Sequence, residues 1–386
     1  MAHVGYSVSN HDLRMADSGD SMFDEILLKK LSYRHLSDMV QYVSNHSKDI
    51  EIKGKKMYDC SKSAVGSLTR LPIELLHNVF EMLDFQSLLR FSGASRRAST
   101  LVQTSPVYRD LIEYAHRGLA ALAFSGLISY HPAGALRAAL RSQNCFLCGH
   151  YGQLLFLPSC QRCCRICTLR NQSLWVLPRG VAAKCFRIPL RQVDQLPGIL
   201  RLLGFPHGRF GAPTYITPKL ESFVSVACAK RLALAIHGSE EKITDLPIST
   251  RLSDTKRELY AHYRAARLRP YNTDPLLIFT AVNGIEDPHE DYAHILFPSI
   301  ASGVMDRGFL CSGCLWMHRH YHPTFDRPTG LVPTDLGPED LIFRARSREN
   351  FLRHIRMCFG VRLIVASRGL EHWGQEIAHI PINQWA

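Results

Sequence analysis

Cysteine and histidine residues grouped at short spacings are the part of this sequence whose residue types could do chemistry. The chain of 386 residues contains twelve cysteines. Six of them lie between Cys145 and Cys167, a further CxxC pair begins at Cys311, and His354 and Cys358 follow near the end. We expect an intracellular protein, in which such cysteines are thiols or metal ligands instead of disulfides. The CxxC spacing is typical of zinc sites, so the pattern predicts bound zinc.

The first predicted zinc site joins two CxxC pairs. Cys145 and Cys148 are followed by Gly149, whose small size lets the turn close so that both thiolates face one ion. The second pair is Cys164 and Cys167, and 15 residues lie between Cys148 and Cys164. This number is at the edge of the range usually found between two CxxC pairs that bind one zinc ion. Four thiolates at about 2.3 Å complete a closed tetrahedral site, so we predict a structural role for this ion.

Alternatives remain open for the second pair of this site. Cys160 and Cys163 overlap the preferred pair and have the same spacing, and His150 is a weaker substitute ligand. A RING domain would make the chain a ligase module in its own right, but it requires further ligands soon after these pairs. Only the isolated Cys185 follows nearby, so we reject the RING interpretation.

The second predicted zinc site combines Cys311 and Cys314 with His354 and Cys358. Residues four apart lie on adjacent turns of one helix, so His354 and Cys358 can face the same ion. The long separation between the pairs is tolerated because loop-closure entropy grows slowly with length. Three nearer histidines are alternative ligands: His318, His320 and His322.

No catalytic motif accompanies these clusters. The sequence contains no HExxH, GxSxG, GxGxxG or phosphate-binding Gly-Lys-Ser/Thr loop. His237, in the segment His-Gly-Ser, is more typical of a turn or helix end than of catalysis. We therefore expect a protein that is not an enzyme.

The charge of the chain is positive but spread along it. Lys plus Arg number 46 and Asp plus Glu number 34, which gives a formal charge of +12. The densest basic runs are 162–170, 251–269 and 344–356, and each is interrupted by acidic or apolar residues. These runs favour solvated faces over a phosphate-binding patch, so nucleic-acid binding is an alternative function and not the preferred one. No signal peptide is evident, and the longest apolar stretch, 118–130, is too short to cross a bilayer.

The elements that must position these clusters begin with a polar N-terminal extension. Residues 1–67 are expected to be flexible apart from an amphipathic helix over 21–43, which could act as a docking helix. Residues 68–115 then predict three helices. Pro72 suits the first turn of the first helix, and Asp84 and Ser95 can cap the second and third.

The helical segment closely resembles the F-box. The resemblance rests on Leu71-Pro-Ile-Glu-Leu-Leu76, on Leu88-Leu-Arg-Phe-Ser, and on Ser95-Arg-Arg. It implies that the segment binds a Skp-type adaptor and so joins a cullin-RING ubiquitin ligase through an apolar helix surface. The residues assigned to the adaptor surface by this resemblance are Leu71, Pro72, Leu75, Leu76, Val79, Phe80, Leu83, Leu88 and Leu89.

A second resemblance covers about residues 68–362. In one group of fungal F-box proteins, the F-box is followed by a segment similar to Leu157-Pro-Ser-Cys160-Gln-Arg-Cys163-Cys164-Arg-Ile-Cys167. A His-Gly-Ser motif and a distant CxxC with HxxxC come next, as they do here. The resemblance implies a shared architecture without naming a substrate.

Taken together, these patterns predict a mixed α+β fold. A three-helix F-box is followed by a Cys-rich zinc module at 140–180, a middle region of short strands and helices at 181–310, a second zinc module at 311–362 and a tail at 363–386. We predict a substrate-receptor subunit of a Skp-cullin-F-box ubiquitin ligase, with two structural Zn²⁺ ions and an unknown protein target. The alternatives are a zinc-dependent nucleic-acid binder and an F-box scaffold outside any ligase.

Overall fold

The computed structural model describes residues 21–33, 68, 70–202, 220–268, 289, 293–301, 303–320 and 342–368. The chain forms two compact units. The larger unit spans Leu36–Arg307, and the smaller unit combines Met1–His35 with Gly308–Ala386. The smaller unit is therefore built from both ends of the sequence.

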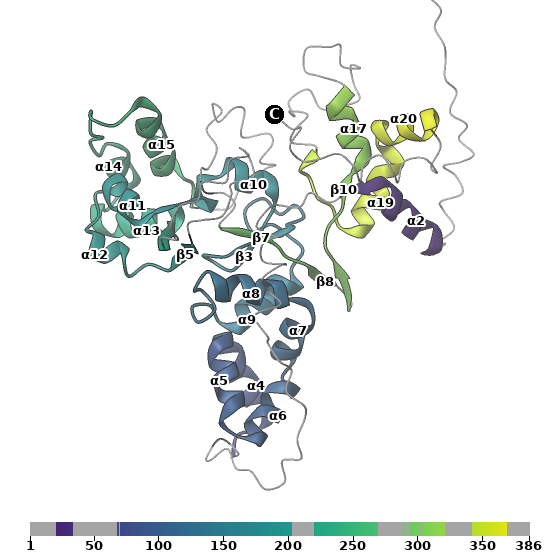
Figure 1. Cartoon of the computed structure of the whole chain (residues 1–386), viewed down its shortest axis with the longest axis horizontal. Coiled ribbons are helices and arrows are strands. Elements are labelled where there is room, and N and C mark those ends of the chain that lie inside the picture. Colours follow the sequence, from purple (N-terminus) through teal and green to yellow (C-terminus); the bar gives the residue numbers. More distant parts are fainter. Residues whose placement is uncertain are drawn as a thin grey trace, which may run out of the picture. The chain divides into compact units, whose positions relative to one another are not determined.

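Three short helices form one end of the larger unit (Figure 1). The first begins after Pro72, which has no amide hydrogen to leave unpaired. Asp84 accepts a hydrogen bond from the Ser87 amide at 2.8 Å and begins the second helix. Ser95 begins the third by accepting from the Ala98 amide at 3.1 Å. These helices are α4 (Ile73–Met82), α5 (Phe85–Ala94) and α6 (Arg96–Thr104).

A second group of three helices joins this end to the rest of the larger unit. The last of the three packs against α4, and Gly134 permits the close approach. A Cβ atom at Gly134 would lie 2.9 Å from the carbonyl oxygen of Glu81. The same helix also contacts strands of the Cys-rich region, so it links the two parts. The three helices are α7 (Pro106–Tyr114), α8 (His116–Phe124) and α9 (Ala133–Arg141).

The Cys-rich region is organised by a small antiparallel sheet. Its central strand consists of Leu154, Leu155 and Phe156, which are all buried and therefore need a partner on each side. One partner comes from residues 294–296, so the predicted middle region does not run unbroken from 181 to 310. The segment that carries the second cysteine pair forms a strand, a short helix and a 3-10 turn. The elements are β2 (Leu154–Phe156), β3 (Gln161–Cys163), β7 (His294–Leu296), α10 (Arg165–Arg170), η3 (Gln172–Leu174), and the hairpin β8 (Ser299–Ala301) with β9 (Val304–Asp306).

A separate sheet and its helices form the middle part of the larger unit. The strand order is β4-β6-β5, with antiparallel pairing throughout. Trp175 and Tyr263 meet edge to face in the core beside this sheet, where both are almost fully buried. The mixture of short strands and helices expected from the sequence for the middle region is present in this part. The elements are β4 (Val176–Pro178), α11 (Arg179–Phe186), α12 (Leu190–Val193), β5 (Gly198–Leu202), β6 (Leu220–Ser225), α13 (Val226–His237), α14 (Glu240–Thr244) and α15 (Asp254–Ala265).

The smaller unit pairs an N-terminal segment with the C-terminal part of the chain. The helix expected over 21–43 ends at Leu31, because Ser32 and Tyr33 form a strand that pairs with Leu310 and Cys311. This N-terminal segment is therefore part of a folded unit and is not an independent docking helix. Residues 34–67 and the predicted tail beyond 368 lie outside the described residues. The elements are α2 (Ser21–Leu31), β1 (Ser32–Tyr33), β10 (Leu310–Cys311), α17 (Ser312–His320), α19 (Arg348–Met357) and α20 (Phe359–Arg368).

Candidate functional site

The first pair of cysteines in the larger unit is shaped by a tight turn. The Gly149 amide donates to the Cys145 carbonyl at 2.9 Å, and the Cys145 amide donates to the His150 carbonyl at 2.6 Å. Gly149 has a φ of +73°, a conformation that costs glycine little. The turn places the side chains of Cys145 and Cys148 on the same side of the loop.

The second pair comes from the start of α10. Cys164 occupies the cap position, and its sulfur accepts a hydrogen bond from the Cys167 amide at 3.4 Å. The Sγ atoms of Cys148 and Cys164 are 3.7 Å apart, and the four sulfurs of this cluster all lie within 4.8 Å of one another. Two sulfurs bound to one tetrahedral zinc at about 2.3 Å would be about 3.8 Å apart. The cluster therefore has the size of a closed Cys₄ zinc site.

The pKa values of these thiols are shifted because the four sulfurs lie so close to one another. Hydrogen bonds from Cys148 and Cys164 hold the pKa of Cys145 well below its usual range. The neighbouring thiols Cys145 and Cys148 raise the pKa of Cys164 well above its usual range. Four thiolates so close together repel one another, and a divalent cation among them would offset that repulsion. The donor set thus fits Zn²⁺.

The alternative ligands of the first site lie outside this cluster. Cys160 has a φ of +54° and is buried, and burial raises the pKa of its thiol to about 12. Burial also raises the pKa of Cys163, which lies on β3 with its side chain in the interior. His150 is exposed at the surface of the loop. None of these three residues belongs to the group of four sulfurs.

The smaller unit brings together the residues expected at the second site. Cys311 ends β10, Cys314 lies in the first turn of α17, His354 lies on α19, and Cys358 directly follows α19. The Sγ of Cys314 is 3.3 Å from His354 Nε2, and Cys311 Sγ is 3.8 Å from Cys358 Sγ. All four donor atoms lie within 4.8 Å of one another. Three sulfurs and one imidazole nitrogen form another donor set that suits structural zinc.

The histidines considered as alternatives at the second site are not members of this group. His318 lies on α17, but its ring nitrogens are not among the grouped atoms. The side chain of His320 and all of His322 lie outside the described residues.

The N-terminal segment lines the second site, which the sequence did not indicate. Leu27, Leu28 and Leu31 are buried in the same core cluster as Cys311, Cys314 and Cys358. Ser32 is paired directly with Cys311 in the β1–β10 ladder. The Tyr33 hydroxyl donates to the Ile342 carbonyl at 2.6 Å, and Glu25 pairs with Arg348. Three kinds of contact therefore hold residues 25–33 against the metal-ligating segments.

The predicted adaptor surface divides into exposed and buried residues. Leu71, Pro72, Leu75 and Val79 are exposed, and Leu83 and Leu89 are half-buried. Leu76, Phe80 and Leu88 are buried in the free chain, and their assignment to the adaptor surface stays a prediction. Their side chains point into the helical core because they lie on the opposite face of the helices. Two exposed residues of α4 were not predicted, Ile73 and Met82, the latter 78% exposed.

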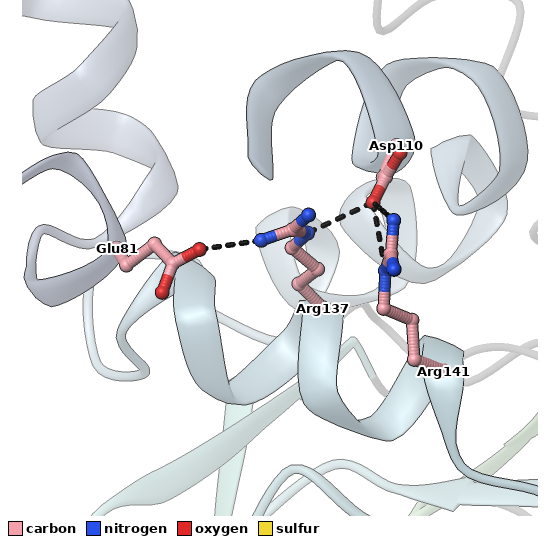
Figure 2. Close-up of polar contacts among 4 residues, drawn as sticks. All are labelled: Glu81, Asp110, Arg137 and Arg141. Atoms are coloured by element: carbon pink, nitrogen blue, oxygen red, sulfur yellow. Dashed lines mark hydrogen bonds and ion pairs between the residues drawn. The ribbon is translucent and has the colours of Figure 1, made fainter. Parts of the chain in front are cut away.

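Charged residues join this helical end to α9, as Figure 2 shows. Arg137, on α9, donates to Glu81 of α4 at 2.5 Å and to Asp110 of α7 at 2.8 Å. Arg141 also donates to Asp110. Partial burial alone would raise the pKa of Asp110, but the hydrogen bonds from Arg137 and Arg141 hold it below its usual value. The network bridges three helices with charge-assisted hydrogen bonds.

Several basic residues of the predicted basic runs are structural. Arg162 is buried and donates to the carbonyl oxygens of Ala139, Gly152, Phe297 and Pro298. It also lies over the Phe297 ring, 5.3 Å from its centroid.

Arg264 is buried in the middle part of the same unit, where it donates to the carbonyls of Cys185 and Leu246. Neither it nor Arg162 is available to a phosphate. This arrangement weakens the case for nucleic-acid binding by the runs 162–170 and 251–269.

The His-Gly-Ser segment forms a helix end. His237 is the last residue of α13, and its Nε2 lies 2.9 Å from the Phe186 carbonyl oxygen. Gly238 follows with a φ of +90°, and Ser239 caps α14 through the Lys242 amide. The contacts support the turn interpretation of this motif.

Comparison with known proteins gives one match. The F-box domain family matches residues 68–110, which covers α4, α5, α6 and part of α7. No curated protein and no solved structure matches the chain. The chain therefore contains an F-box domain, and the predicted fungal type of the whole chain is not shown.

The F-box domain suggests a role as an adaptor subunit of a ubiquitin ligase, because such domains bind Skp-type adaptors in cullin-RING ligases. F-box proteins are typically non-catalytic subunits of these ligases. Across the described residues, no helix combines the length and the apolar character needed to span a membrane.

Proposed function

We propose that the protein is the target-binding subunit of a Skp-cullin-F-box ubiquitin ligase. The F-box domain at residues 68–110 is the observation that carries this proposal. In this function the F-box binds the Skp-type adaptor, and the rest of the chain holds a target protein near the ubiquitin-charged enzyme. The protein contributes to the reaction by proximity and supplies no catalytic group.

An exposed apolar surface on the F-box supports the proposal. Leu71, Ile73, Leu75, Val79 and Met82 are large apolar residues, each at least 39% exposed, within one short segment. Exposed apolar patches of this kind usually mark a protein interaction site, and an apolar helix face suits a hydrophobic groove. The buried residues Leu76, Phe80 and Leu88 would support this surface from behind.

The two metal sites have a structural role in this proposal. Zn²⁺ would be held by Cys145, Cys148, Cys164 and Cys167 in the larger unit. In the smaller unit the ligands would be Cys311, Cys314, His354 and Cys358. Each site uses four protein ligands, so no position is left for a substrate. Bound zinc would crosslink the turns and helix ends that carry these ligands.

Co-expression with a Skp-type adaptor tests the proposal. We expect the wild-type chain to co-elute with the adaptor as a one-to-one complex in size-exclusion chromatography. Leu71→Ala combined with Leu75→Ala should abolish this complex, because it removes two exposed apolar anchors.

Leu190→Ala is the matched control for this experiment. Leu190 on α12 is 50% exposed and Leu75 is 49% exposed, so the control removes a similar apolar surface away from the F-box. It should leave the complex intact. A folded wild-type chain that elutes alone would refute the adaptor assignment. Equal loss of the complex in the control would show that the effect is not specific to the F-box surface.

A further inference from the structure

The C-terminal metal unit carries a concentrated positive charge. Between residues 342 and 368 the sequence has seven arginines and a single acidic residue, Glu349. Four of these arginines belong to or directly precede α19 and its metal ligands, at positions 346, 348, 353 and 356. In the basic runs of the larger unit, by contrast, Arg162 and Arg264 are buried.

One face of α19 gathers part of this charge around an apolar side chain. Arg353 lies four residues after Glu349, and Arg356 and Met357 lie three and four residues after Arg353, so the four share one side of the helix, and all are exposed. Met357 is 77% exposed, while Phe351 and Ile355 on the opposite face are buried in the core of the unit. The helix therefore presents a stripe of two arginines beside an uncovered methionine.

Further contacts define the edges of this stripe. Arg353 pairs with Glu349 at 2.8 Å, and its side chain remains 66% exposed. Such an exposed pair is weak, so a carboxylate from a partner can replace Glu349. The Arg362 side chain reaches back to the Arg356 carbonyl at 3.4 Å and extends the basic surface past the end of α19.

One metal ligand lies on the same helix as the stripe, and another directly follows that helix. His354 directly follows Arg353, and Cys358 directly follows Met357. With the ligands grouped at the second site, the direction of α19 is fixed relative to β10 and α17. A surface held in this way loses little conformational entropy when a partner binds.

We infer that the stripe of Arg353, Arg356 and Met357 binds an acidic segment of the target protein that also carries an apolar side chain. This inference rests on the proposed function and adds the chemical class of the target. Arginine and methionine are enriched in protein interfaces, and the methionine gives apolar contact that a phosphate backbone would not use. An acidic, apolar peptide matches both features, so a protein segment is favoured over nucleic acid.

The test uses the full chain in complex with its adaptor and a fluorescein-labelled peptide in which glutamate and leucine alternate. Arg353→Glu combined with Arg356→Glu should weaken peptide binding by about tenfold or more, because two attractions become repulsions. Met357→Gln should weaken it as well. A second peptide with glutamine in place of glutamate should bind poorly to the wild-type chain.

Arg251→Glu combined with Lys256→Glu is the control, since both residues are exposed on the larger unit and the change in net charge is the same. This variant should bind the peptide as the wild type does. Metal content is measured for every variant, because a misfolded unit is recognised by its loss of zinc. If the charge-reversed variant has lost its zinc, peptide binding by Met357→Gln decides whether the inference holds. Equal binding by the charge-reversed variant, or equal loss in the control, overturns the inference.

Two further readouts separate this inference from its alternatives. Duplex DNA that binds the wild-type chain more tightly than the acidic peptide, with the same dependence on Arg353 and Arg356, overturns it in favour of nucleic acid. The charge-reversed variant should still form the adaptor complex. A wild-type chain that forms the adaptor complex but does not bind the acidic peptide refutes only the target class, whereas failure of the wild type to bind the adaptor refutes the proposed function.

Discussion

Arg137 is the residue that bridges the F-box to the helix behind it. Its guanidinium lies between the carboxylates of Glu81 and Asp110, and its side chain is 20% exposed. Without it, both carboxylates lose a charge-assisted partner in a partly buried place. The bridge makes the joint between α4, α7 and α9 dependent on one side chain.

We predict that Arg137→Met lowers the free energy of unfolding of this helical region by about 2 kcal/mol, because charge-assisted hydrogen bonds are lost from both carboxylates. The matched control is Arg141→Met, which removes a partner of the same Asp110 from a side chain that is 56% exposed. The control should cost less than about 1 kcal/mol, as exposed pairs do. The stability loss of each variant is measured by thermal unfolding. Hydrogen exchange of the α4 and α9 amides then shows whether the loss lies in this helical region. Equal effects of the two substitutions would contradict the bridging role.

His294 makes the stability of the Cys-rich sheet sensitive to acid. Burial lowers the pKa of His294 to about 3 in the folded chain, where it stacks on Phe156. The unfolded value is about 6.5. Below pH 6.5 the unfolded state binds a proton that the folded state does not, so stability is full above pH 6.5 and falls as pH drops toward 3.

We predict that His294→Phe removes part of this acid sensitivity while keeping the ring against Phe156. At pH 5.5, one unit below the unfolded pKa, the histidine should cost the wild type about 1 kcal/mol relative to pH 7.5. The difference in unfolding midpoint between pH 7.5 and 5.5, compared for wild type and variant, measures the contribution. Metal ligands also take up protons in acid, and they do so equally in both proteins. Identical pH dependence in the two would refute a role for His294.

The grouping of residues at the metal sites was predictable from spacing, and the buried charges were not. CxxC pairs and a His and Cys four apart restrict geometry, and the preferred donor atoms are the ones grouped, but spacing alone left the pair Cys160 and Cys163 open. Nothing in the sequence distinguishes Arg162 from the half-buried arginines that follow it, because its role depends on carbonyl groups of Phe297 and Pro298 far along the chain. The sequence also did not show that Leu75 is exposed and Leu76 buried, because this depends on the direction in which each side chain leaves α4.

At the scale of elements, α2 and β1 were the least predictable. The apolar spacing indicated a helix, but its end depends on pairing between Ser32 and Cys311, which are distant in sequence. The same holds for β2, whose second partner comes from residues 294–296. By contrast, the caps Asp84 and Ser95 are local interactions, and the expected helix starts match the structure.

The contacts of α2 make its docking dependent on the second metal site. The buried side chains of Leu28 and Leu31 share a core with Cys311 and Cys358. We predict that Leu28→Ala combined with Leu31→Ala speeds zinc loss from this site to a chelator by at least about tenfold, because the segments that carry the ligands open more easily once this packing is lost. A colour-forming chelator should report a faster phase for half of the bound metal.

The control for this experiment is Ile26→Ala on the same helix, where the side chain is exposed. It should release zinc at the wild-type rate. Equal release rates for the double variant and the wild type would show that α2 packs on the unit without supporting its metal site.

At the scale of the whole molecule, the F-box and the metal sites depend on different interactions. Helices α4, α5 and α6 have their own buried core, which includes Leu76, Phe80 and Leu88. The Cys-rich region also has buried apolar residues, such as Leu147 and Ile166, but its two CxxC pairs meet at the four grouped sulfurs. Structural zinc contributes on the order of 10 kcal/mol in small metal modules. Stability is therefore expected to be distributed unevenly along the chain.

We predict that chelation of zinc loosens residues 145–175 and the smaller unit while α4, α5 and α6 remain protected. Hydrogen exchange with and without chelator should show faster amide exchange around Cys145, Cys164 and Cys358, and added zinc should restore protection. Unchanged exchange in these segments would contradict a structural role for the metal. Equal loosening of the F-box helices would show that the domain is not independent of the metal sites.

The smaller unit is built from both ends of the chain, and this has a consequence during protein synthesis. Leu27, Leu28 and Leu31 leave the ribosome early, whereas their partners Cys311 and Phe351 are made only after the whole larger unit. At about 5–20 residues per second, this delay lasts on the order of tens of seconds. Throughout that time the nascent N-terminal helix has no native partner, and its apolar side chains are a binding site for chaperones. Translation speed and chaperone supply should therefore influence the yield of the C-terminal unit more than that of the F-box, whose three helices are complete soon after they emerge.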